Sequence, residues 1–226
     1  MTLHEETLLR AKFSKNEDFA RAAARLVAGE PLAYILGEWY FWRETYLVTP
    51  DVLIPRADTE HVLEALIHRL PQGGRFLDLC TGSGCIAVSA LCERPDATAA
   101  AVDLSPAALD VARQNAARYH VTDRLDFYRS DVTSPCEVEA LIDRAGSFDI
   151  IVSNPPYIDS DVVETLSPAV LAEPRMALDG GADGMDFYRA ILSLFGSALK
   201  PNGAFLFEIG YDQKEKIKAL AAPLSC

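Results

Sequence analysis

Residues 75–84 read RFLDLCTGSG, a short apolar segment followed directly by a turn with two glycines. The segment 75–79 predicts a strand, and a helix is expected to follow the turn. Gly82 and Gly84 allow the backbone to turn tightly and to approach a ligand closely. Cys80 stands where a dinucleotide-binding fingerprint has its first glycine, so the pattern argues against pyrophosphate binding. An ordinary strand-to-helix turn is the alternative interpretation.

Strands and helices are expected to alternate along the rest of the chain. The predicted helices cover residues 84–92, 106–119, 138–144, 185–199 and 213–221, and the further strands cover residues 98–102, 125–129, 148–153 and 204–209. This order implies parallel strand pairing. The expected fold class is α/β, with a doubly wound, mostly parallel sheet whose ligands bind beyond the carboxyl ends of the strands.

Smaller elements are predicted before this alternation begins. An amphipathic helix is expected at 19–27, and the aromatic and β-branched residues at 39–42 and 46–48 predict a β-hairpin. Asp58 is expected to cap a helix over 59–70. The predicted organisation is a short N-terminal helical segment (1–36), a β-hairpin linker (37–56) and a larger α/β domain (57–226).

The composition indicates a soluble globular protein. Half of the 226 residues are apolar, no apolar run reaches the length of about 18 residues that spans a bilayer, and no signal-peptide stretch begins the chain, so a cytoplasmic location without membrane contact is expected. The net charge of −12 and the lack of a dense lysine and arginine cluster argue against nucleic acid as the main partner. The five cysteines are odd in number and have no C-x-x-C spacing, so neither disulfides nor a metal site are expected.

Acidic residues follow two of the predicted strands. Asp103 comes about 20 positions after the glycine turn, where a carboxylate can accept hydrogen bonds from ribose hydroxyls. Capping of the next helix is the alternative role for Asp103. Farther along, the Asp131 carboxylate can accept from an exocyclic amine, and the Val132 N–H can donate to an adenine ring nitrogen. A solvated turn is the alternative for Asp131.

The most specific motif is NPPY, formed by Asn154, Pro155, Pro156 and Tyr157 directly after the strand at 148–153. The prolines fix the backbone and have no N–H to donate, so preceding carbonyls are left free to accept. The Asn154 side chain offers both an acceptor and donors, and Tyr157 offers an aromatic face. Together these groups predict a rigid clamp for a planar NH₂ group, and an ordinary proline-rich turn is the alternative.

At these residues the sequence resembles the class I S-adenosylmethionine-dependent methyltransferases with an NPPY motif, which have a Rossmann-like fold. More narrowly, it is similar to the protein-(glutamine-N5) methyltransferases that modify peptide-chain release factors. The similar region, about 31–218, includes PLAYILG (31–37), LIPRADTE (53–60), DLCTGSGCIA (78–87), NPPY (154–157), EP (173–174), GGADG (180–184), FYR (187–189) and EIG (208–210).

The resemblance implies S-adenosylmethionine as methyl donor and S-adenosylhomocysteine as product. The implied methyl acceptor is a glutamine side-chain amide in a protein, with the Gly-Gly-Gln glutamine of a release factor as the expected substrate. The implied cofactor-binding residues are Asp78, Cys80, Thr81, Gly82, Ser83, Gly84, Asp103, Leu104, Asp131, Val132 and Asn154. The implied catalytic and substrate-binding residues are Asn154, Pro155, Pro156 and Tyr157.

Three features differ from the family pattern. Only 36 residues precede the hairpin in place of a larger helical bundle, the chain stops at Cys226 where two more strands are usual, and Ala57 replaces a common proline. We therefore expect a truncated C-terminus and weakened binding of a protein substrate, with an intact cofactor half. A ribosomal-protein glutamine methyltransferase, a nucleic-acid N6-adenine methyltransferase and a non-catalytic S-adenosylmethionine-binding module are the alternatives.

Overall fold

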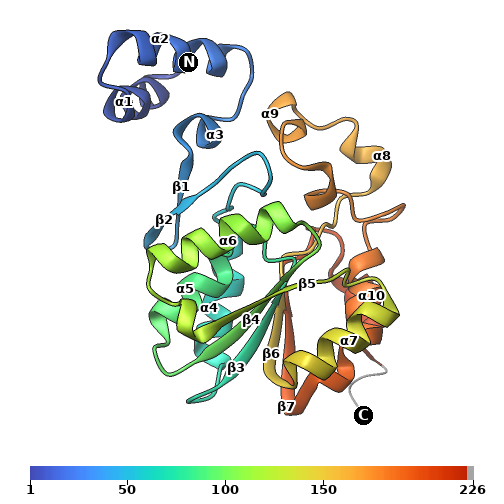
Figure 1. Ribbon diagram of the computed structural model, residues 1–226. Helices are drawn as coiled ribbons and strands as arrows, with labels where there is room; N and C mark the ends of the chain where they lie inside the picture. Colours follow the sequence, from blue (N-terminus) through green and yellow to red (C-terminus); the bar gives the residue numbers. More distant parts are fainter. Residues whose placement is uncertain (223–226) are drawn as a thin grey trace.

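The computed structural model describes residues 1–222, and residues 223–226, which include Cys226, lie outside the described part. A sheet of five parallel strands, in the order β5-β4-β3-β6-β7, forms its centre (Figure 1). The strands are β3 (Arg75–Leu79), β4 (Thr98–Asp103), β5 (Leu125–Arg129), β6 (Phe148–Ser153) and β7 (Leu199–Phe207). The predicted doubly wound parallel sheet is therefore confirmed.

The strand order reverses between β3 and β6. The chain builds β3, β4 and β5 outward in one direction and then returns to place β6 on the other side of β3. At such a switch point the loops after the two central strands run to opposite faces of the sheet and leave a crevice between them. The glycine turn follows β3 and the NPPY loop follows β6, so the topology brings both motifs to this crevice.

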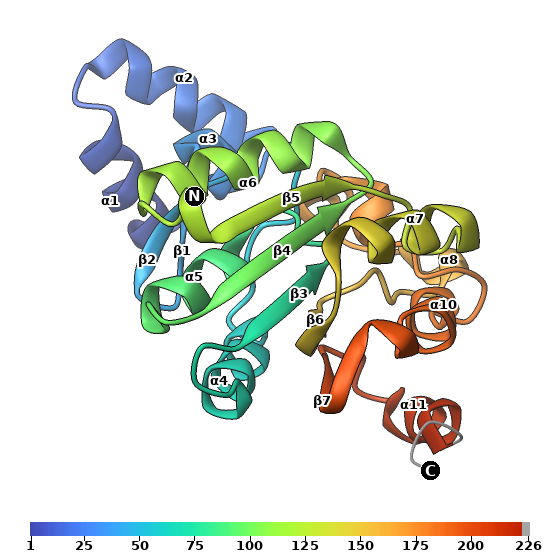
Figure 2. The same cartoon turned by 60° about the horizontal axis from the view of Figure 1, so that its bottom comes forward.

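Helices cover both faces of the sheet (Figures 1 and 2). One face packs against α4 (Thr59–Arg69), α5 (Cys85–Glu93) and α6 (Pro106–Arg118), the other against α7 (Pro135–Ala145) and α10 (Asp186–Leu194), and α11 (Lys214–Ala221) lies beside α10. Successive strand residues point to opposite faces. Phe76 and Ile150 accordingly belong to the first core, and Leu77 and Ile151 belong to the second.

The N-terminal segment contains three helices, α1 (Leu3–Lys12), α2 (Asn16–Val27) and α3 (Leu32–Leu36). The sequence predicts only α2, because α1 is polar and α3 is very short. A reciprocal pair of hydrogen bonds between Thr2 and Glu5 begins α1. The three helices share a small core of their own, made by Leu9, Ala22 and Ile35. The division of the chain after residue 36 remains a prediction.

The predicted hairpin is present as β1 (Glu38–Phe41) paired antiparallel with β2 (Glu44–Leu47). The buried side chain of Asn115, on α6, accepts from the Leu47 N–H at 2.8 Å and donates to the Leu47 carbonyl at 3.0 Å. The same amide donates to the Ser83 carbonyl at 2.8 Å. One buried asparagine therefore fastens the hairpin to the glycine turn.

Asp58 does not cap α4, contrary to the prediction. Its backbone is already helical (φ −62°, ψ −32°), and its side chain makes no capping hydrogen bond. Carbonyls of the preceding turn accept instead, because the Thr59 N–H lies 3.2 Å from the Arg56 oxygen and the Glu60 N–H lies 3.1 Å from the Ala57 oxygen. The turn thereby fixes Thr59 as the first residue of α4.

The structure also corrects the ends of several predicted elements. The helices α2 and α7 each begin three residues before their predicted starts, and two other elements differ more. The helix predicted over 185–199 ends at Leu194, and a 3₁₀ turn, η3 (Gly196–Ala198), follows it, because a glycine disfavours helix continuation. The strand predicted over 204–209 begins earlier, since β7 pairs with β6 from Leu199 onward through an irregular register. Because β7 ends at Phe207, Glu208 is a loop residue at the carboxyl edge of the sheet and not a strand residue.

Short helical turns occupy the connection between the NPPY loop and α10. They are α8 (Ser160–Val163), α9 (Pro168–Leu171) and η2 (Arg175–Ala177), and a further 3₁₀ turn, η1 (Thr122–Arg124), precedes β5. Within residues 1–222, no helix is long and apolar enough to cross a membrane. The same residues contain no group of three or more histidine, cysteine, aspartate or glutamate side chains arranged to hold a metal ion.

Candidate active site

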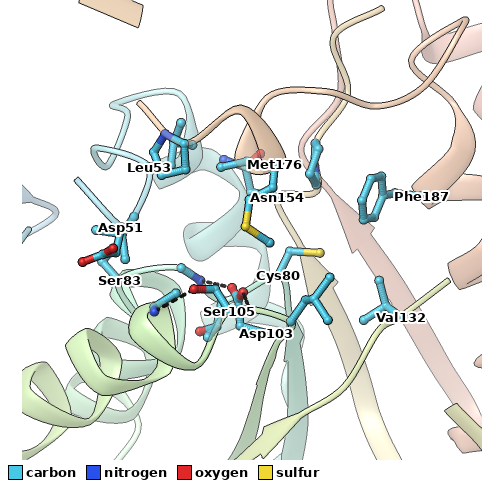
Figure 3. Close-up of a pocket in the computed structure, with 18 of the residues that line it drawn as sticks. Asp51, Leu53, Cys80, Ser83, Asp103, Ser105, Val132, Asn154, Met176 and Phe187 are labelled. Atoms are coloured by element: carbon cyan, nitrogen blue, oxygen red, sulfur yellow. Dashed lines mark hydrogen bonds between the residues drawn. The ribbon is translucent and has the colours of Figure 1, made fainter. Parts of the chain in front are cut away.

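A cavity of about 310 Å³ opens at the carboxyl ends of the parallel strands. Its walls come from the loops after β3, β4, β5 and β6, from residues 51–56 before α4, from residues 174–179, and from Phe187 of α10. Figure 3 shows side chains from these elements around a single space. Segments that are far apart in the sequence therefore build one pocket where the topology predicts a ligand.

Most of the predicted site residues line this pocket, namely Cys80, Thr81, Gly82, Ser83, Asp103, Leu104, Asp131, Val132, Asn154 and Pro156. The other four, Asp78, Gly84, Pro155 and Tyr157, are not among the lining residues and lie within two positions of them in the sequence. The Asp78 carboxylate accepts a hydrogen bond from Thr81 of the glycine turn, and Gly84 is the N-cap residue of α5. Pro155 and Tyr157 belong to the NPPY loop, so these four residues support the wall of the pocket.

The glycine turn has an unusual backbone. Three residues of the turn have positive φ angles, 58° at Cys80, 54° at Gly82 and 78° at Gly84. Residues other than glycine rarely adopt this left-handed region. A Cβ atom on Gly84 would lie 3.0 Å from the Cβ of Ala112, so this glycine also permits close packing of α5 on α6. Gly82 is therefore required for the backbone conformation of the turn, and Gly84 is required both for this conformation and for close packing.

The Asp103 carboxylate holds the glycine turn and the start of α6 together. Its Oδ2 accepts from the Gly82 N–H at 2.9 Å, and its Oδ1 accepts from the Ser105 N–H at 2.9 Å (Figure 3). Burial raises the pKa of Asp103, although these backbone N–H groups favour its ionised form. Each carboxylate oxygen can accept more than one hydrogen bond, so both retain capacity for a hydroxyl group of a ligand. Ser105 itself caps α6 by accepting from the Ala108 N–H at 3.2 Å.

Asp78 is completely buried beneath the pocket wall. Its Oδ2 accepts from the Thr81 hydroxyl at 2.6 Å, whereas its Oδ1 has no partner among residues 1–222. Burial in a low-dielectric interior disfavours the charged form and raises the pKa of Asp78 to about 7. The carboxyl group that anchors the glycine turn therefore titrates near neutral pH.

Two polar side chains after β5 face the same cavity. The Ser130 hydroxyl is buried, lines the pocket and has no partner within the described chain. Asp131 uses its Oδ1 to accept from the Thr133 N–H at 2.8 Å and from the Thr133 hydroxyl at 2.6 Å. No hydrogen bond found within residues 1–222 involves the other Asp131 oxygen. Both side chains can therefore bond to polar groups of a ligand.

A buried network joins the NPPY loop to α4 and to the end of β7. The Asn154 side chain donates from Nδ2 to the Thr59 hydroxyl at 3.1 Å, and Thr59 donates to Glu208 Oε2 at 2.5 Å. The Tyr157 hydroxyl donates to Glu208 Oε1 at 3.2 Å. Burial raises the pKa of Glu208 and raises the pKa of Tyr157 to about 12. Three segments of the chain thus meet in one hydrogen-bond network around the Glu208 carboxylate.

Close backbone contacts hold the NPPY loop from behind. A Cβ atom on Gly180 would lie 2.7 Å from the Tyr157 Cα and 2.8 Å from the Pro156 oxygen, so only glycine fits there. The Gly180 N–H donates to the Ile158 carbonyl at 2.8 Å. The Gln213 side chain donates to the Tyr157 carbonyl at 2.9 Å. Packing against Gly180 and a hydrogen bond from Gln213 therefore fix the loop that contains Asn154.

Comparisons with known proteins identify the family. Residues 57–182 match the family described as methyltransferase small domain. The chain is 40% identical to the release factor glutamine methyltransferase of Caulobacter vibrioides, over 91% of this chain and 68% of that protein. The proteins of the same name from Nitratidesulfovibrio vulgaris and Cereibacter sphaeroides are 42% and 44% identical, over 92% and 89% of this chain and 69% of each relative. The chain belongs to the release factor glutamine methyltransferase family. It is an S-adenosylmethionine-dependent methyltransferase, as the resemblance implies.

Solved structures share the fold of this methyltransferase. The ribosomal protein L11 methylase from Lactobacillus delbrueckii subsp. bulgaricus is 21% identical, with a TM-score of 0.52 over 79% of this chain and 74% of that one. The precorrin-6y C5,15-methyltransferase from Geobacter metallireducens GS-15 is 15% identical, with a TM-score of 0.54 over 80% of this chain and 75% of that one. At such identities the likeness extends to the fold alone.

The pocket of this methyltransferase fits S-adenosylmethionine. The Asp103 carboxylate has free lone pairs for hydroxyl groups, as a ribose requires. The Ser130 hydroxyl, which has no partner among residues 1–222, and the second Asp131 oxygen suit the polar edge of an adenine ring. Val132 and Phe187 add apolar and aromatic surface for the ring itself (Figure 3). The donor and acceptor groups present therefore match the chemistry of the cofactor.

Sequence reasoning missed two buried residues of the methyltransferase site, Thr59 and Glu208. The sequence predicts a helix start at Thr59 and a strand at Glu208, and the family segments LIPRADTE (53–60) and EIG (208–210) contain both residues without indicating a role for either. A usable signal existed at Glu208, because a polar residue follows an apolar run there, as at Asp103 and Asn154. No local signal connects Thr59 with Glu208, since 149 positions separate them in the sequence.

Proposed function

We propose that this protein transfers a methyl group from S-adenosylmethionine to the side-chain amide nitrogen of a glutamine in a peptide-chain release factor, within a Gly-Gly-Gln tripeptide. Relatives named release factor glutamine methyltransferase are 40% to 44% identical over most of this chain. The NPPY loop gives the most direct structural support. Asn154 lines the pocket, and none of the hydrogen bonds found within residues 1–222 engages the Pro155 carbonyl.

The acceptors of the NPPY loop suit an amide nucleophile. An amide nitrogen is a poor nucleophile because its lone pair is delocalised into the neighbouring carbonyl. Asn154 Oδ1 and the Pro155 carbonyl can each accept one N–H of the substrate NH₂ group, which holds the nitrogen at the pocket and aims its lone pair inward. The same acceptors stabilise positive charge that develops on that nitrogen. The rigid turn keeps both acceptors in place before the substrate arrives.

The remaining predicted residues are assigned to the cofactor. S-adenosylmethionine supplies a methyl group on a positively charged sulfur when it is bound. We assign Asp103 and Leu104 to the ribose end of the pocket, and Asp131 and Val132 to the adenine end. The glycine turn, Cys80 to Gly84, together with Asp78 behind it, shapes the wall between β3 and α5. The apolar and aromatic side chains of the pocket exclude water from the reacting groups.

A methylation assay tests the proposed activity. The protein is incubated with S-adenosylmethionine that carries a labelled methyl group and with a release factor, and modified peptides are located by mass spectrometry. We expect label on the glutamine of the Gly-Gly-Gln tripeptide and none on a release factor in which that glutamine is alanine. The matched substrate isolates the amide nitrogen as the acceptor.

Parallel reactions with a ribosomal protein and with duplex DNA decide between the alternatives. Label on the ribosomal protein but not on the release factor would replace the proposed substrate by the first alternative. Label on adenine of the DNA would support a nucleic-acid methyltransferase. Binding of S-adenosylhomocysteine without transfer to any of these would leave a non-catalytic module. The expected cytoplasmic location and role in translation termination are part of the proposal, since both follow from a release factor as substrate.

A further inference from the structure

Glu208 is a buried carboxylate next to the NPPY loop, and the proposed transfer step does not use it directly. It follows β7, is 8% exposed, and its backbone is fixed at both ends. Its N–H donates to the Ser153 carbonyl at 3.0 Å, and its carbonyl accepts from the Tyr188 hydroxyl at 2.8 Å. An ionised carboxylate can only accept hydrogen bonds. Glu208 is therefore a fixed acceptor at the base of the site.

The Thr59 hydroxyl connects Glu208 to Asn154 through two hydrogen bonds. Its hydroxyl has a single proton and is 2.5 Å from Glu208 Oε2, so that proton points to the carboxylate. The hydroxyl must then act as acceptor toward Asn154, 3.1 Å away. Only the NH₂ end of an amide can donate, so Nδ2 faces Thr59. The amide oxygen of Asn154 is left on the other side of the group.

We propose that Glu208 is a positioning residue, which acts through Thr59 to hold the Asn154 amide with its oxygen directed to the substrate. This inference rests on the proposed function, because it assigns the free oxygen to the substrate NH₂ group. The opposite orientation would place the Asn154 NH₂ against the substrate NH₂, two donors facing each other. Rotation of the Asn154 side-chain amide by half a turn would therefore convert the active orientation into an inactive one.

Protonation of Glu208 reverses the direction of the network. A protonated Glu208 donates to Thr59, and the Thr59 proton then turns to Asn154, which must present its oxygen to Thr59. The active form is consequently the ionised one, and turnover rises with pH as Glu208 loses its proton. Burial raises the pKa of Glu208, and the nearby charge of Asp58 acts in the same direction. The other titratable groups close to Glu208 are Cys85, Tyr157 and Tyr188.

Substitution of Thr59 tests the hydrogen-bond relay. Thr59→Val keeps the shape of the side chain but removes the hydroxyl, and Thr59→Ser keeps the hydroxyl. We expect Thr59→Val to lower kcat by about ten- to a hundred-fold, with the affinity for S-adenosylhomocysteine unchanged, because orientation of the acceptor is lost. Thr59→Ser should restore most of the rate. Equal rates for the valine and serine variants would overturn the proposed relay. If the wild-type enzyme is active, the proposed function would still stand.

Substitution of Glu208 tests the direction of the relay. In Glu208→Gln the group no longer titrates, so the fall in kcat on the acid side should disappear or move, whatever the rate at neutral pH. An acid limb identical to that of the wild type would count against Glu208 as its origin and against the proposal. Thermal unfolding of both Thr59 variants and of Glu208→Gln identifies any variant that fails to fold, and the pH profile is read only from folded protein.

A measurement without turnover separates this inference from the proposed function. In protein labelled with nitrogen-15, the Asn154 side-chain NH₂ signal is assigned by its loss in Asn154→Ala. Thr59→Val should shift this signal, because the amide loses its hydrogen-bond acceptor, and Thr59→Ser should leave it close to its wild-type position. If these shifts are seen but the wild-type protein does not methylate a release factor, the proposed substrate is refuted and the relay is supported. An unshifted signal in Thr59→Val would refute the relay alone.

Discussion

At Asn154, the two ends of one amide have different roles. Its NH₂ end donates to the Thr59 hydroxyl, and we propose that its oxygen accepts from the substrate. Replacement by alanine removes the acceptor without removing the turn, which the following two prolines maintain. We expect Asn154→Ala to lower kcat by about 10²–10³, the usual effect of deleting one preorganised charge-stabilising hydrogen bond. Rates of transfer to the release factor and calorimetry with S-adenosylhomocysteine measure the two functions separately.

Asn154→Asp provides the matched control for this prediction. It keeps the size of the side chain and an acceptor for the substrate, but it loses the donor to Thr59, so partial activity is expected. An alanine variant that binds S-adenosylhomocysteine and turns over at the wild-type rate would show that NPPY is only a structural turn in this protein.

Asp78 makes the stability of the protein depend on pH. Its pKa is raised by burial from an ordinary value of 3.8 to about 7 in the folded state. The unfolded chain loses this proton near pH 4 and the folded chain near pH 7, so the folded state binds more protons in between. Stability is therefore greatest at low pH as far as this group is concerned, and it is lost as pH rises toward 7, by at most about 1.4 kcal/mol for each pH unit.

Asp78→Asn should abolish this contribution. We expect the free energy of unfolding of the wild type to fall relative to that of the variant between pH 5 and pH 7, and to run parallel to it at higher pH. Urea unfolding at several pH values gives the difference between the two curves. A difference between the two curves that stays constant over this pH range would refute the raised pKa of Asp78.

At the scale of elements, the NPPY loop depends on a glycine in the GGADG segment. A Cβ atom on Gly180 would collide with backbone atoms of Pro156 and Tyr157, which cannot move like the end of a flexible side chain. We expect Gly180→Ala to destabilise the fold by about 1–3 kcal/mol and to displace the loop. The turnover of the protein that remains folded should fall at least tenfold, since displacement of reacting groups by about 1 Å is costly.

Gly73→Ala is the control for this loop displacement. Gly73 has φ of 65°, does not line the pocket, and has no neighbouring atom of residues 1–222 within 4 Å of an added Cβ, so alanine introduces backbone strain outside the pocket. It should cost about 1–2 kcal/mol of stability and leave turnover unchanged. Chemical unfolding and kcat, measured on both variants, separate general destabilisation from misplacement of the loop. Full turnover in Gly180→Ala would show that the loop tolerates displacement.

The sequence predicts these elements unevenly, for physical reasons. The strands β3, β5 and β6 agree with the prediction to the residue, because each is a compact segment with clear flanking turns. The predicted limits of β7 are wrong because residues 200–203 are polar and turn-forming. These residues nevertheless belong to the strand, which pairs with β6 through an irregular register. The pocket-lining loops were found at strand ends, where the topology alone predicts them. Contacts such as Thr59 with Glu208 have no local signature and required the folded chain.

At the scale of the whole molecule, one buried side chain joins segments from both halves of the pocket. Glu173 accepts from the Ile54 N–H at 2.9 Å and pairs with the Arg56 guanidinium, and its own side chain is 2% exposed. These contacts tie residues 51–56, which precede the sheet, to residues 174–179, which precede α10. Both segments line the cavity. Glu173 therefore links two walls of the pocket that are more than 100 positions apart in the sequence.

Loss of this tie should weaken cofactor binding more than it weakens the fold. In Glu173→Gln the side chain keeps an oxygen for the Ile54 N–H but loses the charge that holds Arg56, an effect of about 1.5–3 kcal/mol for a hydrogen bond to a charged group. Because Arg56 is partly exposed, solvent screening reduces this figure, and we expect the dissociation constant of S-adenosylhomocysteine to rise about tenfold. Glu164→Gln is the control, since Glu164 also pairs with an arginine, Arg175, but is 68% exposed. Calorimetry on both variants should show an effect only at Glu173, because an exposed ion pair contributes little. Equal affinities for Glu173→Gln and the wild type would mean that the two segments close the pocket without this carboxylate.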